Sequence, residues 1–443
     1  MVLASLAGVV GPHHVSTDPD VLAGRSVDHT GRYRGRASAL VRPGSAGEVA
    51  EVLRICRDAG AHVTIQGGRT SLVAGTVPEH DDVLLSTERL SAVGDVDTAE
   101  RRIEVGAGAT LAAVQRAAAH AGLVFGVDLT ARDTATLGGM ASTNAGGLRT
   151  VRYGTMSAQV VGLDVALPDG SVLRRHSRVR ADNTGYDLPA LFVGAEGTLG
   201  VITGLDLRLH PTPTHRVTAV CGFSDLAALV DAGRLFRDLD GIAALELIDR
   251  RATAAVPVDG DWLLLVELAS DHEQTERLAG ALAGVAMCSE PAVGVDPAAQ
   301  QRLWRVRESV AEVLGAYGPP LKFDVSLPLS AVDGFAAAAD ELIRRHAPDA
   351  LPVLFGHIGE GNLHLNVLRC TSDAEAALYA AMMELIARCG GNVSSEHGVG
   401  SRKRGYVGMS REAADVAAMR RIKAAFDPTG YLNAAVLFSP APL

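Results

Sequence analysis

The stretch LFGHIGEGNLHLNV, residues 354–367, places two histidines around a glycine-rich bend. Asn362, His364 and Asn366 alternate with apolar residues, so a strand here has one polar face and one apolar face. Residues 353–358, before the bend, also have the composition of a strand. A strand that carries amides and a histidine on its inner face is more typical of a site than of a dry core.

The bend sets the distance between the two histidines. If Glu360 and Gly361 form a two-residue hairpin turn, the register pairs His357 directly with His364, close enough to share one ligand. The same residues also fit a pair of hydrogen-bonded core histidines. From this stretch alone, the metal site and the core pair are equally good interpretations.

Length and composition limit the function classes. A chain of 443 residues is expected to form two or three domains. The net charge of −10 argues against a nucleic-acid partner. The five cysteines lack metal-motif spacing, which favours a reducing compartment and a cytoplasmic protein. No apolar run reaches the ~18 residues of a membrane span, and the apolar N-terminus lacks the basic flank of a secretory signal. Peripheral attachment to a membrane is left open.

Three glycine-rich segments mark the N-terminal half. A predicted strand at 63–65, which follows a predicted helix at 45–59, runs into QGGRTSL, residues 66–72. Glycines and hydroxyls after a strand suit either a phosphate cradle or a plain tight turn. The second segment, residues 128–147, contains two Gly-Gly pairs, and this composition predicts neither helix nor strand but close approach to a ligand. The third, residues 183–203, runs into a strand that ends near His210. Pro211 and Pro213 are the predicted domain boundary.

Strands and helices alternate from Val217 onwards, which predicts an α+β domain over one sheet. Arg307 is expected on a helix that begins near Pro297. Lys322, Asp324 and Ser326 are expected on one face of a strand. Each basic residue alone is ordinary, but Arg307 and Lys322 together suit a substrate carboxylate.

Glu396 supplies a third candidate metal ligand, because two histidines and a glutamate form a normal set for zinc or manganese. His397 is expected to point away from Glu396 and therefore suits a general base. The alternative is a structural Glu-His pair at a helix start.

The three glycine-rich segments resemble the FAD-binding domain of the vanillyl-alcohol oxidase/p-cresol methylhydroxylase (PCMH) flavoproteins. With His357-x6-His364, Ser395-Glu396-His397-Gly398, Arg307 and Lys322, the chain resembles the D-2-hydroxyacid dehydrogenases of that superfamily, a group with D-lactate, glycolate and D-2-hydroxyglutarate enzymes. The resemblance implies an α+β fold with a two-subdomain PCMH-type FAD-binding domain at 1–212. It implies a cap with a central antiparallel sheet at 213–443, in which about 398–443 pack back towards the flavin.

The resemblance also implies site residues. FAD is expected to bind non-covalently, because the first loop has Arg69 and no histidine. The implied FAD-binding residues are Gln66, Gly67, Gly68, Arg69, Thr70, Ser71, Asp128, Thr136, Gly138, Gly139, Ser142, Asn144, Gly146, Gly147, Glu196, Gly197, Gly200, Ile202 and Asn433. A divalent zinc or manganese ion is implied on His357, His364 and Glu396. Substrate contacts are implied for Arg307, Lys322 and Asn366, and His397 is implied as the base.

The implied reaction is oxidation of a D-2-hydroxyacid to the 2-oxoacid with hydride transfer to flavin N5. No nicotinamide fingerprint is present, so a quinone, a cytochrome or an electron-transfer flavoprotein is the expected acceptor. A homodimer is left open, and Ala311, where the 2-hydroxyglutarate branch has threonine, disfavours a dicarboxylate. Two alternatives stay open: a metal-free oxidase of the same fold acting on another alcohol, and an electron-transfer subunit of a larger complex.

Overall fold

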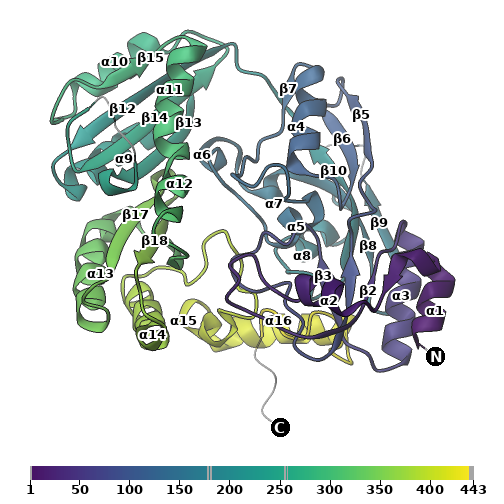
Figure 1. Cartoon of the computed structure of the whole chain (residues 1–443). Coiled ribbons are helices and arrows are strands. Elements are labelled where there is room, and N and C mark those ends of the chain that lie inside the picture. The colour runs from purple at the N-terminus through teal and green to yellow at the C-terminus, as the bar shows by residue number, and fades with distance from the viewer. Residues whose placement is uncertain (1, 177–178, 180–181, 254–255, 257, 439–443) are drawn as a thin grey trace. The chain divides into compact units, whose positions relative to one another are not determined.

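The structure is a computed structural model that describes residues 2–176, 179, 182–253, 256 and 258–438. The chain forms two compact units (Figure 1). The first contains Met1–Gly146, Gly154–Pro211 and Glu396–Leu443, and the second contains Gly147–Tyr153 and Thr212–Ser395. The first unit is therefore assembled from three separated pieces of the chain.

One sheet of the first unit has the strand order β1-β2-β4-β3, and its last three strands are parallel. The strands are β1 (Val15–Ser16), β2 (Ala37–Val41), β3 (Val63–Gln66) and β4 (Asp82–Ser86). Helix α3 (Ala46–Asp58) connects β2 to β3, because parallel strands need a crossover. The Ser45 side chain accepts a hydrogen bond from the Glu48 N–H at 3.2 Å and so caps the predicted helix, a contact of about 1 kcal/mol.

The second sheet of this unit is antiparallel, with the order β5-β6-β10-β8-β9. Its strands are β5 (Val93–Asp97), β6 (Arg102–Gly106), β8 (Val160–Ala166), β9 (Val172–His176) and β10 (Val201–Arg208). The other α-helices and strands described in the unit are α1 (Val2–Val10), α2 (Pro19–Arg25), α4 (Leu111–His120), β7 (Leu123–Val124), α5 (Leu137–Ser142), α7 (Met156–Gln159), α8 (Leu188–Phe192), β11 (His210–Pro211), α15 (Val407–Ser410) and α16 (Ala413–Phe426).

The prediction that the second glycine-rich segment avoids helix was wrong, because α5 contains both Gly138 and Gly139. The reason is packing. A Cβ on Gly138 would lie 2.6 Å from the Ala107 Cβ, so only glycine allows this helix to lie so close to β6. Close packing outweighs the roughly 1 kcal/mol that each glycine costs a helix.

Residues 431–433 return to β3. The Val63 N–H donates to the Tyr431 carbonyl at 3.0 Å, and the Asn433 N–H donates to the Val63 carbonyl at 2.8 Å. Tyr431 and Leu432 are buried in the core that also contains Val49 and Leu53 of α3. The C-terminal segment is thus an integral part of the first unit.

The second unit is built on one antiparallel sheet with the order β15-β12-β14-β13-β17-β18-β16. The strands are β12 (His215–Phe223), β13 (Ile242–Asp249), β14 (Trp262–Ser270), β15 (Ala292–Gly294), β16 (Leu321–Ser326), β17 (Leu351–His357) and β18 (Asn362–Leu368). The helices are α6 (Thr150–Tyr153), α9 (Leu226–Arg237), α10 (Thr275–Ala283), α11 (Pro297–Glu308), α12 (Val310–Gly315), α13 (Val332–His346) and α14 (Ser372–Arg388). Helices combined with antiparallel sheets confirm the predicted α+β class.

The two faces of this sheet differ in chemistry. One face packs under α9, α13 and α14 and is apolar, as the stacked rings of Phe323 and Tyr379 illustrate. The other face packs under α11 and α12, where Leu303, Val306 and Val310 cover the apolar part of the strands. Beyond that apolar part the same face becomes polar, and there the candidate site residues lie.

No helix in the described ranges is long and apolar enough to cross a bilayer.

Candidate functional site

The three glycine-rich segments and the C-terminal asparagine meet within the first unit. The Gly68 N–H donates to the Thr136 hydroxyl at 3.2 Å, which joins the first segment to the second. The Glu196 N–H donates to the Ser142 carbonyl at 2.7 Å, which joins the second to the third. Asn433 links the third back to the first, since its amide donates to the Glu196 carbonyl at 2.8 Å and accepts from the Ile65 N–H at 2.9 Å.

Each of these segments contains one non-glycine residue with a strained backbone conformation. Arg69, Asn144, Glu196 and Asn433 have φ values of 56°, 51°, 50° and 44°, a left-handed region that costs a non-glycine residue on the order of 1 kcal/mol. One such residue lies in each of the four segments. Five further non-glycine residues with positive φ lie outside these segments, namely Ala74, Asp81, Arg101, Arg369 and Leu437, so backbone strain alone does not identify a ligand site.

Gln66 provides a direct test of whether these segments fit a cofactor. Its amide nitrogen donates to the Arg25 carbonyl at 2.8 Å and to the Thr76 carbonyl at 2.9 Å. Its side-chain oxygen is buried and has no hydrogen-bond partner among the described residues. A buried polar atom without a protein partner is expected beside a ligand or an ordered water, so the segment fits the expected cofactor.

Glu196 has a second role that the sequence did not predict. Its carboxylate accepts hydrogen bonds from the Val399 N–H at 2.8 Å and the Gly400 N–H at 2.7 Å. Burial raises the pKa of this carboxyl, and the two N–H groups and Lys403 oppose that rise. The side chain therefore holds the loop that follows His397, in addition to the expected role of Glu196 near the flavin.

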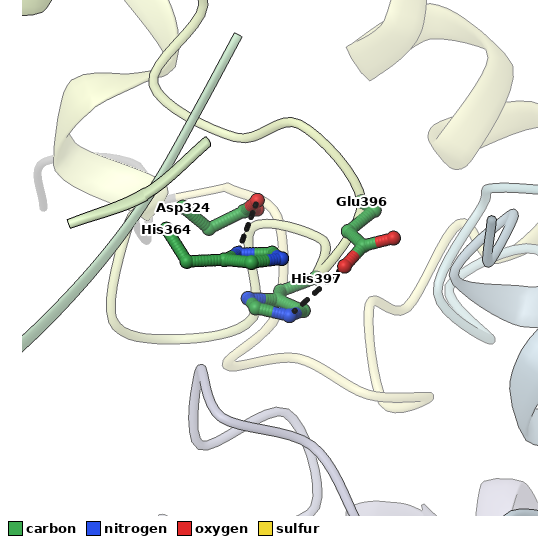
Figure 2. Close-up of side chains that lie close together, drawn as sticks. All are labelled: Asp324, His364, Glu396 and His397. Carbon is green, nitrogen blue, oxygen red and sulfur yellow. Dashed lines mark ion pairs between the residues drawn. The ribbon is translucent and has the colours of Figure 1, made fainter. Parts of the chain in front are cut away.

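Glu396 and His397 lie side by side in the first unit (Figure 2), with 3.4 Å between the Glu396 Oε1 and the His397 Nε2. The prediction that the two side chains point different ways was wrong. Consecutive side chains point to opposite sides of an extended chain, but this segment is a loop in which Gly398 and Gly400 have φ values of +81° and +54°. The alternative interpretation, a structural Glu-His pair at a helix start, finds no helix in the described loop 396–403.

The hairpin of the second unit has a different register from the predicted one. Residues 358–361 form a four-residue connection, so His357 pairs with Asn362, and His364 pairs with Phe355. Gly361 closes the turn with φ +71°, and a Cβ there would lie 2.1 Å from the Leu327 carbonyl oxygen. Because the register differs by an even number of residues, both histidines keep the same face. Their ring centroids are 5.4 Å apart on a diagonal of the ladder.

A buried glutamate on β13 joins two of the predicted site residues. The Glu246 Oε1 lies 2.6 Å from the His357 Nδ1, and its Oε2 accepts from the Arg307 Nε at 2.6 Å. Burial alone would raise the pKa of Glu246, but the charges of His357 and Arg307 outweigh it and lower that pKa. The Arg307 guanidinium lies 4.9 Å above the Phe355 ring, which in turn lies 5.2 Å from the His364 ring.

The edge strand β16 supplies another set. Asp324 pairs with His364 across the ladder, with 4.0 Å between the Asp324 Oδ1 and the His364 Nδ1 (Figure 2). The Asp324 Oδ2 accepts from the Ser395 N–H at 3.0 Å. Lys322 is exposed and pairs with the buried Asn366. The structure thus brings Lys322, His364, Asn366 and His357 onto one face, next to Arg307.

Two acids in this site were not predicted as site residues. Asp324 had a signal, because the alternation of residues 321–327 already placed it on the face of Lys322. Glu246 had a weaker one, since it is the single charged residue in the apolar run AALELI, residues 243–248. A lone acid in a buried strand requires a cationic partner, but the sequence does not reveal which one.

Comparison with known proteins places these observations in a family. Residues 37–175 match the FAD binding domain, and residues 212–437 match the C-terminal domain of FAD linked oxidases. The chain is 36% identical to a mitochondrial D-2-hydroxyglutarate dehydrogenase of Bos taurus over 97% of its own length and 82% of that protein. It is 34% identical to a D-2-hydroxyglutarate dehydrogenase of Xanthomonas citri pv. viticola over 98% and 96%.

Solved structures agree in fold. p-Cresol methylhydroxylase superposes with a TM-score of 0.81 at 17% identity, covering 98% of this chain and 96% of that one. An alkyldihydroxyacetonephosphate synthase superposes with a TM-score of 0.77 at 16% identity, covering 98% and 84%. The predicted PCMH-type fold is confirmed. The chain belongs to the FAD-linked oxidase family, and within that family it is an FAD-dependent D-2-hydroxyacid dehydrogenase.

Proposed function

We propose that this enzyme oxidises a D-2-hydroxyacid to the 2-oxoacid in the presence of a divalent zinc or manganese ion and passes electrons to an acceptor other than a nicotinamide. The observation that carries the proposal is the polar face of the cap sheet. There, Glu246 holds both His357 and Arg307 beside His364.

The donor set supports a metal. Imidazole and carboxylate groups suit zinc and manganese, and His357 and His364 lie on one face of the hairpin. Glu396 directly follows Ser395 in the chain and supplies the carboxylate of the proposed set. His357, His364 and Glu396 are the proposed ligands, and Asp324 either joins them or orients His364. Such an ion would lower the pKa of the substrate hydroxyl.

The proposed roles of the other residues follow from their charges. Arg307 offers a planar pair of donors for the substrate carboxylate, and Lys322 adds a point charge. Asn366 would contact substrate from the same face. His397 would take the hydroxyl proton, and Glu396 at 3.4 Å would stabilise the imidazolium that forms. FAD, held non-covalently by the four segments of the first unit, supplies the hydride acceptor.

Two observations bear on which acid is oxidised. The relatives are named for D-2-hydroxyglutarate, which favours a dicarboxylate. Position 311 on α12 is an exposed alanine, which offers no polar group to a second carboxylate. D-2-Hydroxyglutarate and D-lactate are therefore the two substrates to compare first.

The deciding experiment is anaerobic reduction of the bound flavin by a panel of D-2-hydroxyacids, followed at the visible flavin band, with and without prior chelation. We expect fast reduction by one or more D-acids, little reduction by the L-acids, loss of reduction after chelation, and recovery on addition of Zn²⁺ or Mn²⁺. Elemental analysis should find about one such ion per chain. Full reduction by a protein free of metal would contradict the metal site and favour a metal-free oxidase.

The acceptor is tested separately. A quinone analogue, a cytochrome and an electron-transfer flavoprotein are offered to the substrate-reduced enzyme, and reoxidation of the flavin is timed. NAD is the control and is expected to leave the flavin reduced. A flavin that no hydroxyacid reduces, but that a protein partner reduces, would instead indicate an electron-transfer subunit.

A further inference from the structure

Glu246 occupies an unusual position in the cap sheet. Glu246 is 1% exposed, and its two carboxylate oxygens bind different partners on two elements, His357 on β17 and Arg307 on α11. A buried carboxylate is unfavourable unless it is paired and hydrogen-bonded. His357 is a proposed metal ligand and Arg307 is proposed to bind the substrate carboxylate, whereas Glu246 itself has no proposed role so far.

The contact with His357 fixes which ring nitrogen can bind a metal. An ionised carboxylate only accepts hydrogen bonds, so the His357 Nδ1 at 2.6 Å must carry the proton. In the neutral ring, the form that binds a metal, the lone pair is then on Nε2, on the far side of the ring from Glu246. Carboxylates that hold a ligating histidine in this way set both its tautomer and its orientation.

The contact with Arg307 fixes the guanidinium plane. Glu246 uses the Nε of Arg307, and the ring of Phe355 lies 4.9 Å from the guanidinium carbon. The bond to Glu246 therefore does not consume the two Nη nitrogens, which form the fork that binds a carboxylate bidentately. Phe355 pairs with His364 in the ladder, so this plane is also set relative to the second proposed ligand.

We propose that Glu246 is a positioning residue shared by the two half-sites, in which one oxygen orients the metal ligand His357 and the other orients the carboxylate-binding Arg307. This inference rests on the proposed function. It predicts that a single substitution of Glu246 weakens both metal binding and substrate binding. Substitution of His357 should weaken chiefly metal binding, and substitution of Arg307 chiefly substrate binding.

The test is Glu246→Gln, which keeps the size of the side chain but can no longer accept from both partners. Two quantities are measured: the Zn²⁺ affinity of the metal-free protein, by competition with a chelating dye, and the KM for the D-2-hydroxyacid that reduces the wild-type flavin fastest. We expect the Zn²⁺ affinity to fall about 10–100-fold and the KM to rise about tenfold or more, with the flavin spectrum unchanged. His357→Ala should lower chiefly the Zn²⁺ affinity, and Arg307→Lys should raise chiefly the KM.

Glu267→Gln is the matched control. Glu267 is equally buried on the neighbouring strand β14 and also lies under α11, but it binds Trp304, Thr218 and two other arginines. Its substitution should lower the melting temperature while leaving the Zn²⁺ affinity and the KM within about twofold of the wild type. If a folded Glu246→Gln variant also keeps its Zn²⁺ affinity and its KM within about twofold of the wild type, whether or not its melting temperature falls, the inference is wrong.

Two further arms complete the test. Should Glu246→Gln fail to fold, Glu246→Asp replaces it, because it keeps the charge but is too short to reach both partners. In that variant, the Zn²⁺ affinity should fall about tenfold or the KM should rise about tenfold. If neither the Zn²⁺ affinity nor the KM changes, the inference is wrong. A wild-type protein that binds no Zn²⁺ and whose flavin no D-2-hydroxyacid reduces would instead contradict the proposed function.

Discussion

The carboxylate of Glu196 accepts a hydrogen bond from the Gly400 N–H at 2.7 Å, across 204 positions of sequence. The contact joins the third glycine-rich segment to the loop that carries His397. Gly398 lies against the same carboxyl group, since a Cβ there would be 3.0 Å from the Glu196 Cδ. The position of the proposed base is therefore set by a residue of the flavin-binding unit.

Glu196→Ala should reduce turnover, because two loop N–H groups lose their acceptor and His397 is no longer held in place. We expect kcat to fall about 10–100-fold, by analogy with other supporting contacts at active sites. The check is steady-state kinetics together with the flavin content of the purified variant. Glu48→Ala serves as the control, because Glu48 also accepts a backbone N–H, that of Gly44, but does so at the surface. A variant with a full flavin content and unchanged kcat would contradict this role.

His397→Ala should remove the proton acceptor and leave the binding sites intact. Loss of a general base lowers the rate by about 10²–10⁴-fold, so kcat should fall by this amount while FAD content and Zn²⁺ content stay near those of the wild type. Rapid anaerobic mixing isolates the reductive step. His120→Ala, at the exposed C-terminal end of α4, is the control and should retain full activity. Unimpaired flavin reduction in His397→Ala would assign the base to another residue.

Arg307→Lys should raise the KM while it preserves the charge. Lysine can replace neither the Nε contact with Glu246 nor the bidentate fork, and hydrogen bonds to charged groups contribute about 1.5–3 kcal/mol. The KM for the hydroxyacid should rise about 10–100-fold, as measured by initial rates over a wide substrate range. Arg305→Lys, an exposed position on the same helix, should leave the KM unchanged. Equal effects at both positions would indicate a general disturbance of α11.

Glu267 should make the stability of the cap depend on pH. Burial alone would raise its pKa, but Arg149 and Arg216 outweigh burial and hold that pKa below the ordinary value of 4.5. A group with a lowered pKa in the folded state stabilises the fold above its unfolded pKa and loses that contribution as the pH falls through the folded pKa. Stability should therefore decline as the pH drops below about 4.5.

The comparison is between wild type and Glu267→Gln in urea at pH 7 and at successively lower pH. At pH 7 the variant should be about 3 kcal/mol less stable, because two arginines lose their buried partner. The difference should narrow as the pH falls below 4.5, since the wild type then also loses the charge. A difference that stays constant over this range would mean that the charge of Glu267 does not stabilise the fold.

Local patterns predicted much of the fold. Alternation placed Lys322, Asp324 and Ser326 on one face, and helical spacing with Ser45 at the start predicted α3 almost to the residue. These features depend only on near neighbours in the chain. The resemblance to a flavoprotein family gave the fold of both halves, which the comparisons confirm. The individual roles in metal, substrate and flavin binding stay predictions.

The features that could not be predicted from the sequence depend on contacts between residues far apart in the chain. The hairpin register depends on Gly361 fitting beneath the Leu327 carbonyl. The loop at Glu396 and His397 has its shape because Glu196 accepts two of its N–H groups. The partners of Glu246 come from positions 307 and 357. Alternation predicts which face a side chain occupies, but not which distant side chain it meets.

The three-piece assembly of the first unit also has a consequence for biosynthesis. Leu432 is fully buried in its core, and Asn433 hydrogen-bonds to both Ile65 and Glu196, so this unit cannot complete its fold until residue 433 has left the ribosome. Most of the second unit, Thr212–Ser395, emerges earlier as one continuous piece and can fold while translation continues. The flavin-binding unit, although its sequence comes first, is expected to mature last. During that interval a chaperone that shields its unfinished strands would protect it from aggregation.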